Sequence, residues 1–279
     1  MKEYSIPGHI QKARRNIREL LKAVDLILEL VDSRIPYTGR AYEEEALFLN
    51  KPRIIVFSKT DLADEKGLNL WREFYIANEK IPFVDVSLKE INDVKKLKEF
   101  IMKFLKGIRI KLKEKRIMVV GIPNVGKSSL INALAGKKIA KTGNEPGITR
   151  GIQWITIGRE LKLLDTPGIL YKKVDHPMIY KKLCLIGSIK NFEDIDEVLD
   201  FGFNLLKDRY RNILSDYASI EEIEDLEYQQ FFEKLAEKRK FLKKGGILDL
   251  ERAKHTFLKD LVDGKIGRVV YELPEDVIG

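Results

Sequence analysis

GIPNVGKS, residues 121–128, follows the apolar run RIMVV and precedes a stretch with helical periodicity. It matches the pattern G-x-x-x-x-G-K-[ST], in which glycines let successive backbone N–H groups wrap phosphates at a helix N-terminus. Lys127 is expected to reach the β- and γ-phosphates, and the Ser128 hydroxyl to ligate magnesium. The strand–loop–helix context predicts a P-loop that binds a nucleotide. The predicted nucleotide-binding residues of this loop are Asn124, Val125, Gly126, Lys127, Ser128 and Ser129.

Short β-branched runs alternate with amphipathic segments over about the first 170 residues. Such alternation predicts an α/β domain with a mostly parallel sheet and helices on both faces. From about residue 176 the periodicity is helical, which predicts a small all-α domain. We therefore expect a first domain over 1–175 and a second over 176–279. The expected strands are 25–32, 53–58, 81–87, 116–121 and a hairpin, 151–158 with 160–168, and the expected helices include 41–49, 65–79, 92–106, 194–210, 228–244 and 248–262.

SKTD, residues 58–61, follows a predicted strand and resembles the guanine-reading pattern N-K-x-D. The Asp61 carboxylate can accept from both N1–H and the exocyclic amine of guanine, a donor pair that adenine lacks. Lys59 is expected to lie along the base and tie this loop to the P-loop. Ser58 replaces the usual Asn, so we expect one polar contact to be shortened or lost. After the next strand, Ser87, Leu88 and Lys89 are expected to support the base through backbone N–H groups.

DTPG, residues 165–168, ends the second strand of the predicted hairpin. Downstream of a P-loop, Asp165 is expected to hold magnesium and the Gly168 N–H to sense the γ-phosphate. Thr149 lies between the two motifs, in EPGITRG, and is the candidate for closing over magnesium when the γ-phosphate is present. Together the motifs predict a GTP/GDP site with magnesium.

Composition sets limits on the class of protein. The single cysteine, Cys184, excludes an intrachain disulfide and gives no reason to expect a disulfide-linked partner, and no apolar stretch is long enough to span a bilayer. No signal-peptide pattern is visible, so we expect a cytoplasmic protein without a membrane partner. The net charge is +8, and residues 234–268 hold eleven Lys or Arg against five Asp or Glu. Such a basic block favours a polyanionic partner, although a solvated lysine-rich surface has the same composition.

The order of the motifs is unusual, because the predicted guanine-recognition segment SKTD precedes the P-loop in the chain. This order is a circular permutation of the common GTPase arrangement. With PGHIQKARR near the N-terminus, VDSRIP after the first strand and GKIGR near the C-terminus, the chain resembles the YlqF/RbgA-type circularly permuted GTPases over essentially its whole length.

The resemblance implies a GTPase that binds the large ribosomal subunit and its rRNA late in maturation, is slow alone, and is stimulated by that subunit. It also implies that the helical domain contacts RNA. Two alternatives stay open: an RNA-binding module licensed by GTP with incidental hydrolysis, and a GTPase acting on another RNA. The predicted RNA-binding residues are Lys243, Lys244, Arg252, Lys254, Lys265 and Arg268.

The group that moves the attacking water is not obvious. Many GTPases place a Gln after D-x-x-G, whereas this chain has Ile169, which cannot polarise water. One candidate is a potassium ion held by Asn124 in the P-loop. The other is His9, which the family resemblance marks as important for activity. Lys127, Thr149 and Gly168 complete the predicted catalytic set.

Overall fold

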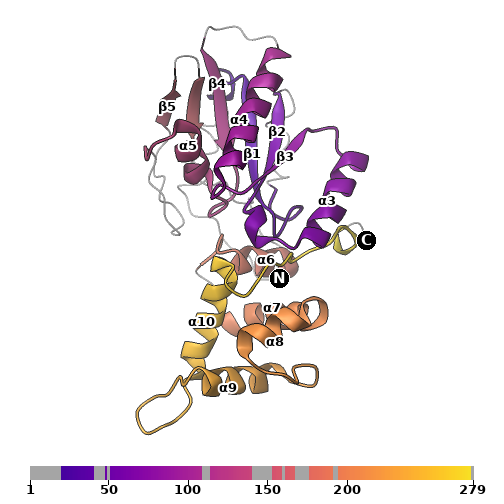
Figure 1. The fold of residues 1–279 in the computed structure, drawn as a ribbon, viewed down its shortest axis with the longest axis vertical. Coiled ribbons are helices and arrows are strands. Elements are labelled where there is room, and N and C mark those ends of the chain that lie inside the picture. Colours follow the sequence, from indigo (N-terminus) through magenta and orange to yellow (C-terminus); the bar gives the residue numbers. More distant parts are fainter. Residues whose placement is uncertain are drawn as a thin grey trace.

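A computed structural model describes residues 20–40, 48, 51–108, 114–139, 153–158, 161–166, 176–190 and 194–277. Its described strands form one six-stranded sheet in the order β3-β2-β1-β4-β6-β5 (Figure 1). Every neighbouring pair is parallel except β5 and β6, which form the predicted hairpin. The predicted mostly parallel sheet is thus confirmed. The strands are β1 Leu26–Asp32, β2 Arg53–Ser58, β3 Phe83–Val86, β4 Lys115–Val120, β5 Gln153–Ile157 and β6 Leu161–Asp165.

Helices cover both faces of this sheet, as alternate side chains of β2 show. Ile54 and Val56 belong to a core cluster that includes Leu97 of α4, whereas Ile55 and Phe57 pack with Trp71 of α3. Successive side chains of a strand point to opposite faces, so α3 and α4 lie on opposite sides of β2. The helices of this half are the 3-10 turn η2 Thr60–Leu62, α3 Glu65–Asn78, α4 Ile91–Lys106 and α5 Lys127–Ala135.

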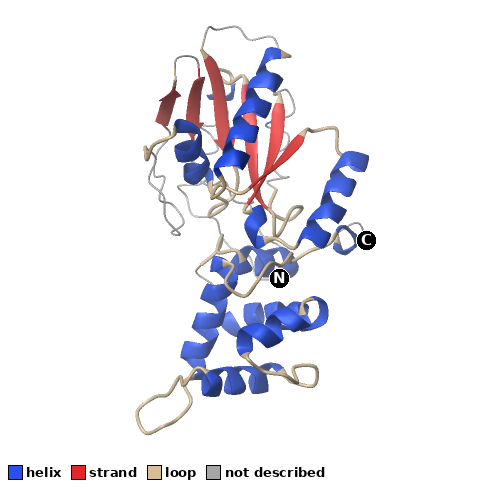
Figure 2. Ribbon diagram, in the orientation of Figure 1, coloured by secondary structure: helices blue, strands red, loops and turns tan. Residues whose placement is uncertain are grey.

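The second half of the chain is helical and lies beyond one end of the sheet (Figure 2). Its helices are α6 Pro177–Leu185, α7 Ile195–Arg209, α8 Arg211–Ala218, α9 Tyr228–Lys238 and α10 Leu250–Asp263, with a 3-10 turn η3 at Pro274–Asp276. The helix expected over 41–49 falls mostly on residues outside the described part. Among the described residues no helix is long and apolar enough to cross a membrane.

The helix expected to continue to Lys244 ends at Lys238 instead. Lys240 adopts a left-handed backbone with φ of 53°, the Lys240 N–H donates to Glu237 O, and the Phe241 N–H donates to Ala236 O. This pair of bonds is a Schellman ending, usually made with glycine. Beyond it, residues 241–249 form a loop closed by the bridge between Leu242 and Leu248. Lys243 and Lys244 therefore lie on a projecting loop and not on a helix.

The C-terminal segment returns to the sheet-containing half of the chain. The Val269 N–H donates to Leu62 O, the Tyr271 N–H to Arg34 O, and Trp71 Nε1 to Glu272 O at 2.8 Å. In Figure 1 this segment runs from α10 to the N-terminal end of α3. The last residues of the predicted helical domain thus pack on the predicted GTPase domain.

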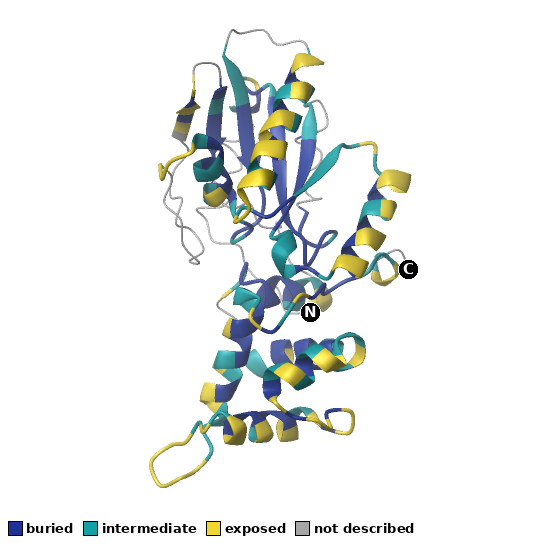
Figure 3. Ribbon diagram, viewed as in Figure 1, coloured by how far each residue is buried: buried dark blue, intermediate teal, exposed yellow. Residues whose placement is uncertain are grey.

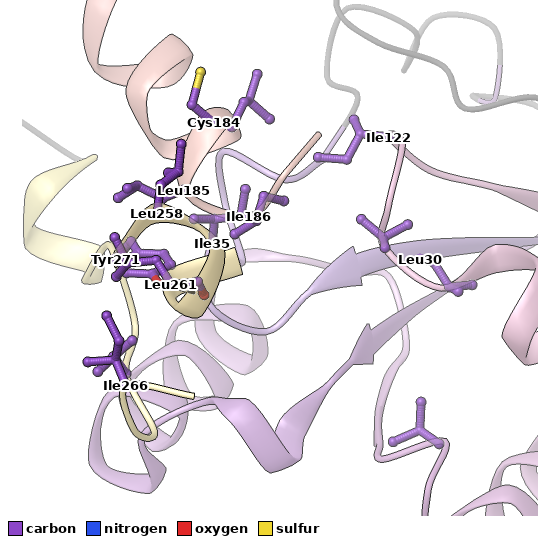
Figure 4. Packing of buried hydrophobic residues seen from close by; sticks show 14 of the residues in the cluster. Leu30, Ile35, Ile122, Cys184, Leu185, Ile186, Leu258, Leu261, Ile266 and Tyr271 are labelled. Atoms are coloured by element: carbon purple, nitrogen blue, oxygen red, sulfur yellow. Dashed lines mark hydrogen bonds between the residues drawn. The ribbon is translucent and has the colours of Figure 1, made fainter. Parts of the chain in front are cut away.

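A continuous apolar core joins the two halves. Figure 4 shows Leu30 and Ile122 at the sheet edge together with Leu185 of α6, Leu261 of α10 and Tyr271 of the returning segment. Figure 3 shows the same continuity, with buried residues running from the strands into α6 and α10. Because this core is shared, the sheet edge and the helices are held in a fixed relative position.

Candidate nucleotide-binding site

The predicted motifs meet at one edge of the sheet, where β1, β2, β4 and β6 have their carboxyl ends. This edge is where ligands bind in open parallel sheets. Gly121 begins the P-loop there with φ of 149°, and a Cβ on it would lie 2.5 Å from Leu30 O. Only glycine fits this close approach to β1, which explains the first glycine of the motif.

Lys127 is the first residue of α5 and is turned into its own loop. Its Nζ donates to Ile122 O at 2.8 Å, and the side chain is buried. Burial lowers the pKa of Lys127 to about 8, although the nearby Asp165 carboxylate opposes the shift. A phosphate at this loop would supply the negative charge that favours the ammonium form.

Ser58 connects the predicted guanine-recognition segment SKTD, residues 58–61 and called the base-reading loop below, to the P-loop. Its hydroxyl lies 2.7 Å from Val125 O and 3.1 Å from Val31 O, and the residue is fully buried. A hydroxyl has one proton, so it donates to one of these carbonyls at a time. Ser58 thus ties the two loops together, and the similar role expected of Lys59 stays a prediction.

The Lys59 side chain turns toward the end of β1. Its Nζ lies 2.9 Å from Asp32 Oδ2, and its backbone is left-handed with φ of 60°. Burial lowers the pKa of Lys59, while the charge of Asp32 opposes the shift. Asp32 was not singled out from the sequence, although its place in VDSRIP at a strand end was a usable signal.

Asp61 lies beside the segment predicted to support the base. Ser87 Oγ donates to Asp61 Oδ1 at 3.2 Å, and Lys89 Nζ lies 2.6 Å from Asp61 Oδ2. Leu88 reaches toward the P-loop, since a Cβ on Gly126 would lie 3.5 Å from Leu88 Cδ1. The residues predicted to read guanine therefore lie close to the P-loop in space.

Two of the three side chains expected to hold magnesium, Ser128 and Asp165, are described and offer oxygen atoms of the kind that this ion prefers, whereas Thr149 lies outside the described residues. Ser128 lies in the first turn of α5, and Asp165 is buried at the end of β6. Magnesium prefers hard oxygen ligands and is often held by one carboxylate, a hydroxyl and phosphate oxygens. Among the described residues no group of three or more His, Cys, Asp or Glu side chains could hold a metal ion by itself.

The P-loop is also joined to the loop that follows α6. Asn124 Nδ2 donates to Ile186 O at 2.7 Å, and Ser188 Oγ donates to Pro123 O at 2.6 Å. The Asn124 backbone is left-handed, with φ of 64°. The residue predicted to hold potassium is therefore bound to the helical half of the chain, an interaction that its sequence position did not reveal.

Three predicted catalytic residues, His9, Thr149 and Gly168, lie outside the described residues, as does the segment 167–175 that joins DTPG to α6. Their roles stay predictions. The described site brings together Ser58, Lys59, Asp61, Ser87, Leu88, Lys89, Asn124, Val125, Gly126, Lys127, Ser128, Ser129 and Asp165.

The predicted RNA-binding residues are not one patch. Lys243 and Lys244 are exposed on the 241–249 loop, and the Arg252 guanidinium lies 4.6 Å from the Phe241 ring centroid at the base of that loop. Lys254 is instead paired with Asp196 at 2.7 Å, and Lys265 lies near Asp260 and Asp263. Arg268 donates to Thr60 O at 3.2 Å, close to the base-reading loop.

Sequence comparisons point to one group of proteins. A family model described as 50S ribosome-binding GTPase matches residues 116–240, and one described as RsgA GTPase matches residues 46–174. The chain is 38% identical to ribosome biogenesis GTPase A of Bacillus licheniformis, over 97% of this chain and 98% of the relative. It is 39% identical to the protein of the same name from Thermotoga maritima, over 97% of this chain and 94% of that relative.

Solved structures agree with the sequence comparisons. GDP-bound YlqF of T. maritima superposes with a TM-score of 0.68 at 33% identity, covering 94% of this chain and 100% of that one. The GNP-bound form from T. maritima gives a TM-score of 0.67 at 34% identity, over 95% and 100%. Both neighbours were solved with guanine nucleotides, which supports GTP and GDP as the ligands of the site described above.

Proposed function

Because the chain belongs to the ribosome biogenesis GTPase A family and is therefore a circularly permuted GTPase, we propose that it acts on the large ribosomal subunit. In this proposal it binds rRNA late in assembly, in the cytoplasm, and its GTP state controls docking or release. Magnesium would be held by Ser128, Thr149 and Asp165. Either a potassium ion at Asn124 or the His9 side chain would complete the catalytic site.

The observation that carries the proposal is the pair of bonds between the P-loop and the helical half. Ser188 binds Pro123 and Asn124 binds Ile186, so a P-loop that changes with its nucleotide acts directly on the end of α6. α6 packs on α7 and α10, and α10 starts at the base of the exposed 241–249 loop. Nucleotide state would thus reach the basic loop through packed helices as well as through the chain that follows DTPG.

The exposed cations on that loop supply the RNA contact in this proposal. Lys243 and Lys244 precede a turn in which Gly245 and Gly246 have positive φ and no atom within 4 Å of a built Cβ, and Arg252 lies at the base of the loop. A glycine pair without side chains lets a phosphate backbone approach closely, while the lysines displace counterions. The loop lies at the end of the molecule farthest from the sheet (Figure 1).

GTP turnover tests the proposal. It should be measured in potassium or sodium buffer, with purified large subunits, small subunits or no addition. We expect turnover alone of about 10⁻⁴ to 10⁻² s⁻¹, stimulation by large subunits only, and loss of turnover in Lys127→Ala. GTP-dependent binding without stimulation would favour the licensed RNA-binding module, and stimulation by another RNA would favour the third alternative. Equal rates in sodium and potassium would remove the potassium role and leave His9 as the candidate.

A further inference from the structure

Asp32, the last residue of β1, lies next to Ser58 in the sheet register and touches the base-reading loop. Its carboxylate is fully buried, and Oδ2 lies 2.9 Å from Lys59 Nζ. Burial alone would raise the pKa of Asp32, but the charges of Arg34 and Lys59 and their hydrogen bonds lower it well below its usual range. Asp32 is therefore a fixed anion beside Lys59.

Arg34 holds this anion with a two-pronged contact. Its Nε donates to Asp32 Oδ1 and its Nη2 to Asp32 Oδ2, both at 2.9 Å. The remaining Nη1 donates to Leu261 O at 2.8 Å and to Val262 O at 3.2 Å, in the last turn of α10. The final carbonyls of a helix lack partners within the helix and form its negative end, so they suit a guanidinium. Arg34, which is fully buried, therefore joins the end of α10 to Asp32.

A second set of contacts joins the same two regions. Gly264 follows α10 with φ of 72°, and a Cβ on it would lie 2.6 Å from Leu62 Cδ2. The Val269 N–H donates to Leu62 O, and Arg268 Nη2 donates to Thr60 O. The VDSRIP and GKIGR segments, neither of which belongs to the nucleotide motifs, thus both contact the base-reading loop or the turn that follows it.

We propose that Asp32 and Arg34 are positioning residues for guanine recognition, and that the end of α10 is part of this arrangement. The α10 carbonyls orient Arg34, Arg34 orients Asp32, and Asp32 holds Lys59 and the left-handed turn that presents Asp61. A partner that displaces α10 therefore changes affinity for the guanine base and not only for the phosphates. The inference rests on the proposed assignment of Lys59 and Asp61 to the base.

The ratio of the affinities for GDP and inosine diphosphate (IDP) isolates the base contact, because IDP lacks only the exocyclic amine from which Asp61 would accept a hydrogen bond. Arg34→Gln is expected to weaken GDP binding about tenfold, the effect of losing one hydrogen bond to a charged group, and to reduce the GDP/IDP ratio. A purely structural loss would lower both affinities equally. Arg209→Gln is the matched control, since it removes the Arg209–Asp276 pair at the end of the chain without touching the base-reading loop.

Arg34→Lys provides a second variant, because it keeps the buried charge while removing the two-pronged geometry. Thermal unfolding of each variant shows that the folded protein is being measured. Asp61→Asn tests the underlying assignment. It should weaken the binding of GDP and strengthen that of xanthosine diphosphate (XDP), whose C2 oxygen can accept a hydrogen bond from the Asn amide. If Asp61→Asn weakens GDP but both Arg34 variants keep the wild-type GDP/IDP ratio, the positioning inference is overturned and the base site survives. If Asp61→Asn leaves GDP affinity unchanged, the base site itself is wrong and the positioning inference falls with it.

Discussion

The Ser58 hydroxyl and the Val125 carbonyl, 67 positions apart in the chain, are joined by a hydrogen bond of 2.7 Å. One residue belongs to the base-reading loop and the other to the P-loop. The bond fixes the distance between the parts of the site that would hold guanine and phosphate. It forms although the serine stands where related GTPase motifs carry a longer asparagine.

Ser58→Ala should therefore weaken GDP and GTP binding together, by about five- to tenfold, because a buried hydrogen bond contributes about 1 kcal/mol and its removal leaves a carbonyl unpaired. Fluorescent GDP titration measures the effect. Ser33→Ala is the control, since Ser33 Oγ bonds to Ser58 O but does not reach the P-loop. Equal losses of affinity in both variants would show that Ser58 acts only through loop stability.

The lowered pKa of Lys127 predicts that nucleotide affinity depends on pH. Burial lowers its pKa to about 8 from the ordinary 10.5, so the phosphate-binding ammonium form is lost as pH rises through about 8. GDP affinity should be constant below pH 7 and fall by up to about tenfold per pH unit above 8. Calorimetry near pH 8 in buffers of different ionisation enthalpy should show proton uptake on binding. Affinity that stays level from pH 7 to 8.5 would contradict this assignment.

The buried contacts of the Glu272 carboxylate predict a large loss of stability when this side chain is truncated. Its buried carboxylate accepts from the Tyr37 and Thr38 N–H groups and from Lys182 Nζ at 2.9 Å. Glu272→Ala leaves the Lys182 ammonium buried without its counter-charge, so urea unfolding should show a cost of about 3–5 kcal/mol. Glu114→Ala, which breaks an exposed pair with Lys162, should cost about 1 kcal/mol or less. Similar costs for both would mean that the interior pair is no stronger than a surface one.

Gly67→Ala tests the docking of the C-terminal segment on α3. Alanine favours a helix by about 1 kcal/mol over glycine, but a Cβ here would lie 2.4 Å from Val270 Cγ2. We expect a net loss of stability that Val270→Ala partly restores, with a coupling of about 0.5–3 kcal/mol in the double-mutant cycle. Stabilisation by Gly67→Ala alone would show that the segment leaves α3 easily.

The 241–249 loop predicts salt-sensitive subunit binding. The double variant Lys243→Glu and Lys244→Glu should weaken binding to large subunits and lower the slope of log affinity against log salt by about 2, one for each phosphate that the lysines no longer neutralise. Lys95→Glu with Lys98→Glu, on the exposed face of α4, carries the same charge change outside the predicted RNA surface. An equal effect of the two pairs would indicate general charge attraction instead of RNA binding by the loop.

Local signals in the sequence were enough to predict the motifs and most elements. The P-loop, SKTD and DTPG are recognisable by residue type and spacing, and apolar runs mark the strands that the structure contains. Parallel strands bring their carboxyl ends to one edge, so even the meeting of Asp61 with Ser87 followed from topology. The permuted order could be read directly along the chain.

Partners far apart in the chain were decided only by the tertiary structure. The end of α9 depends on Lys240 adopting a left-handed backbone, which residue type disfavours, and Lys59 pairs with Asp32, which lies at the end of another strand. Arg34 finds the Leu261 carbonyl 227 positions away because a shared apolar core places the last turn of α10 next to the end of β1. Spacing along the chain encodes chemistry and local structure, whereas such long-range pairings exist only after burial has brought the two halves together.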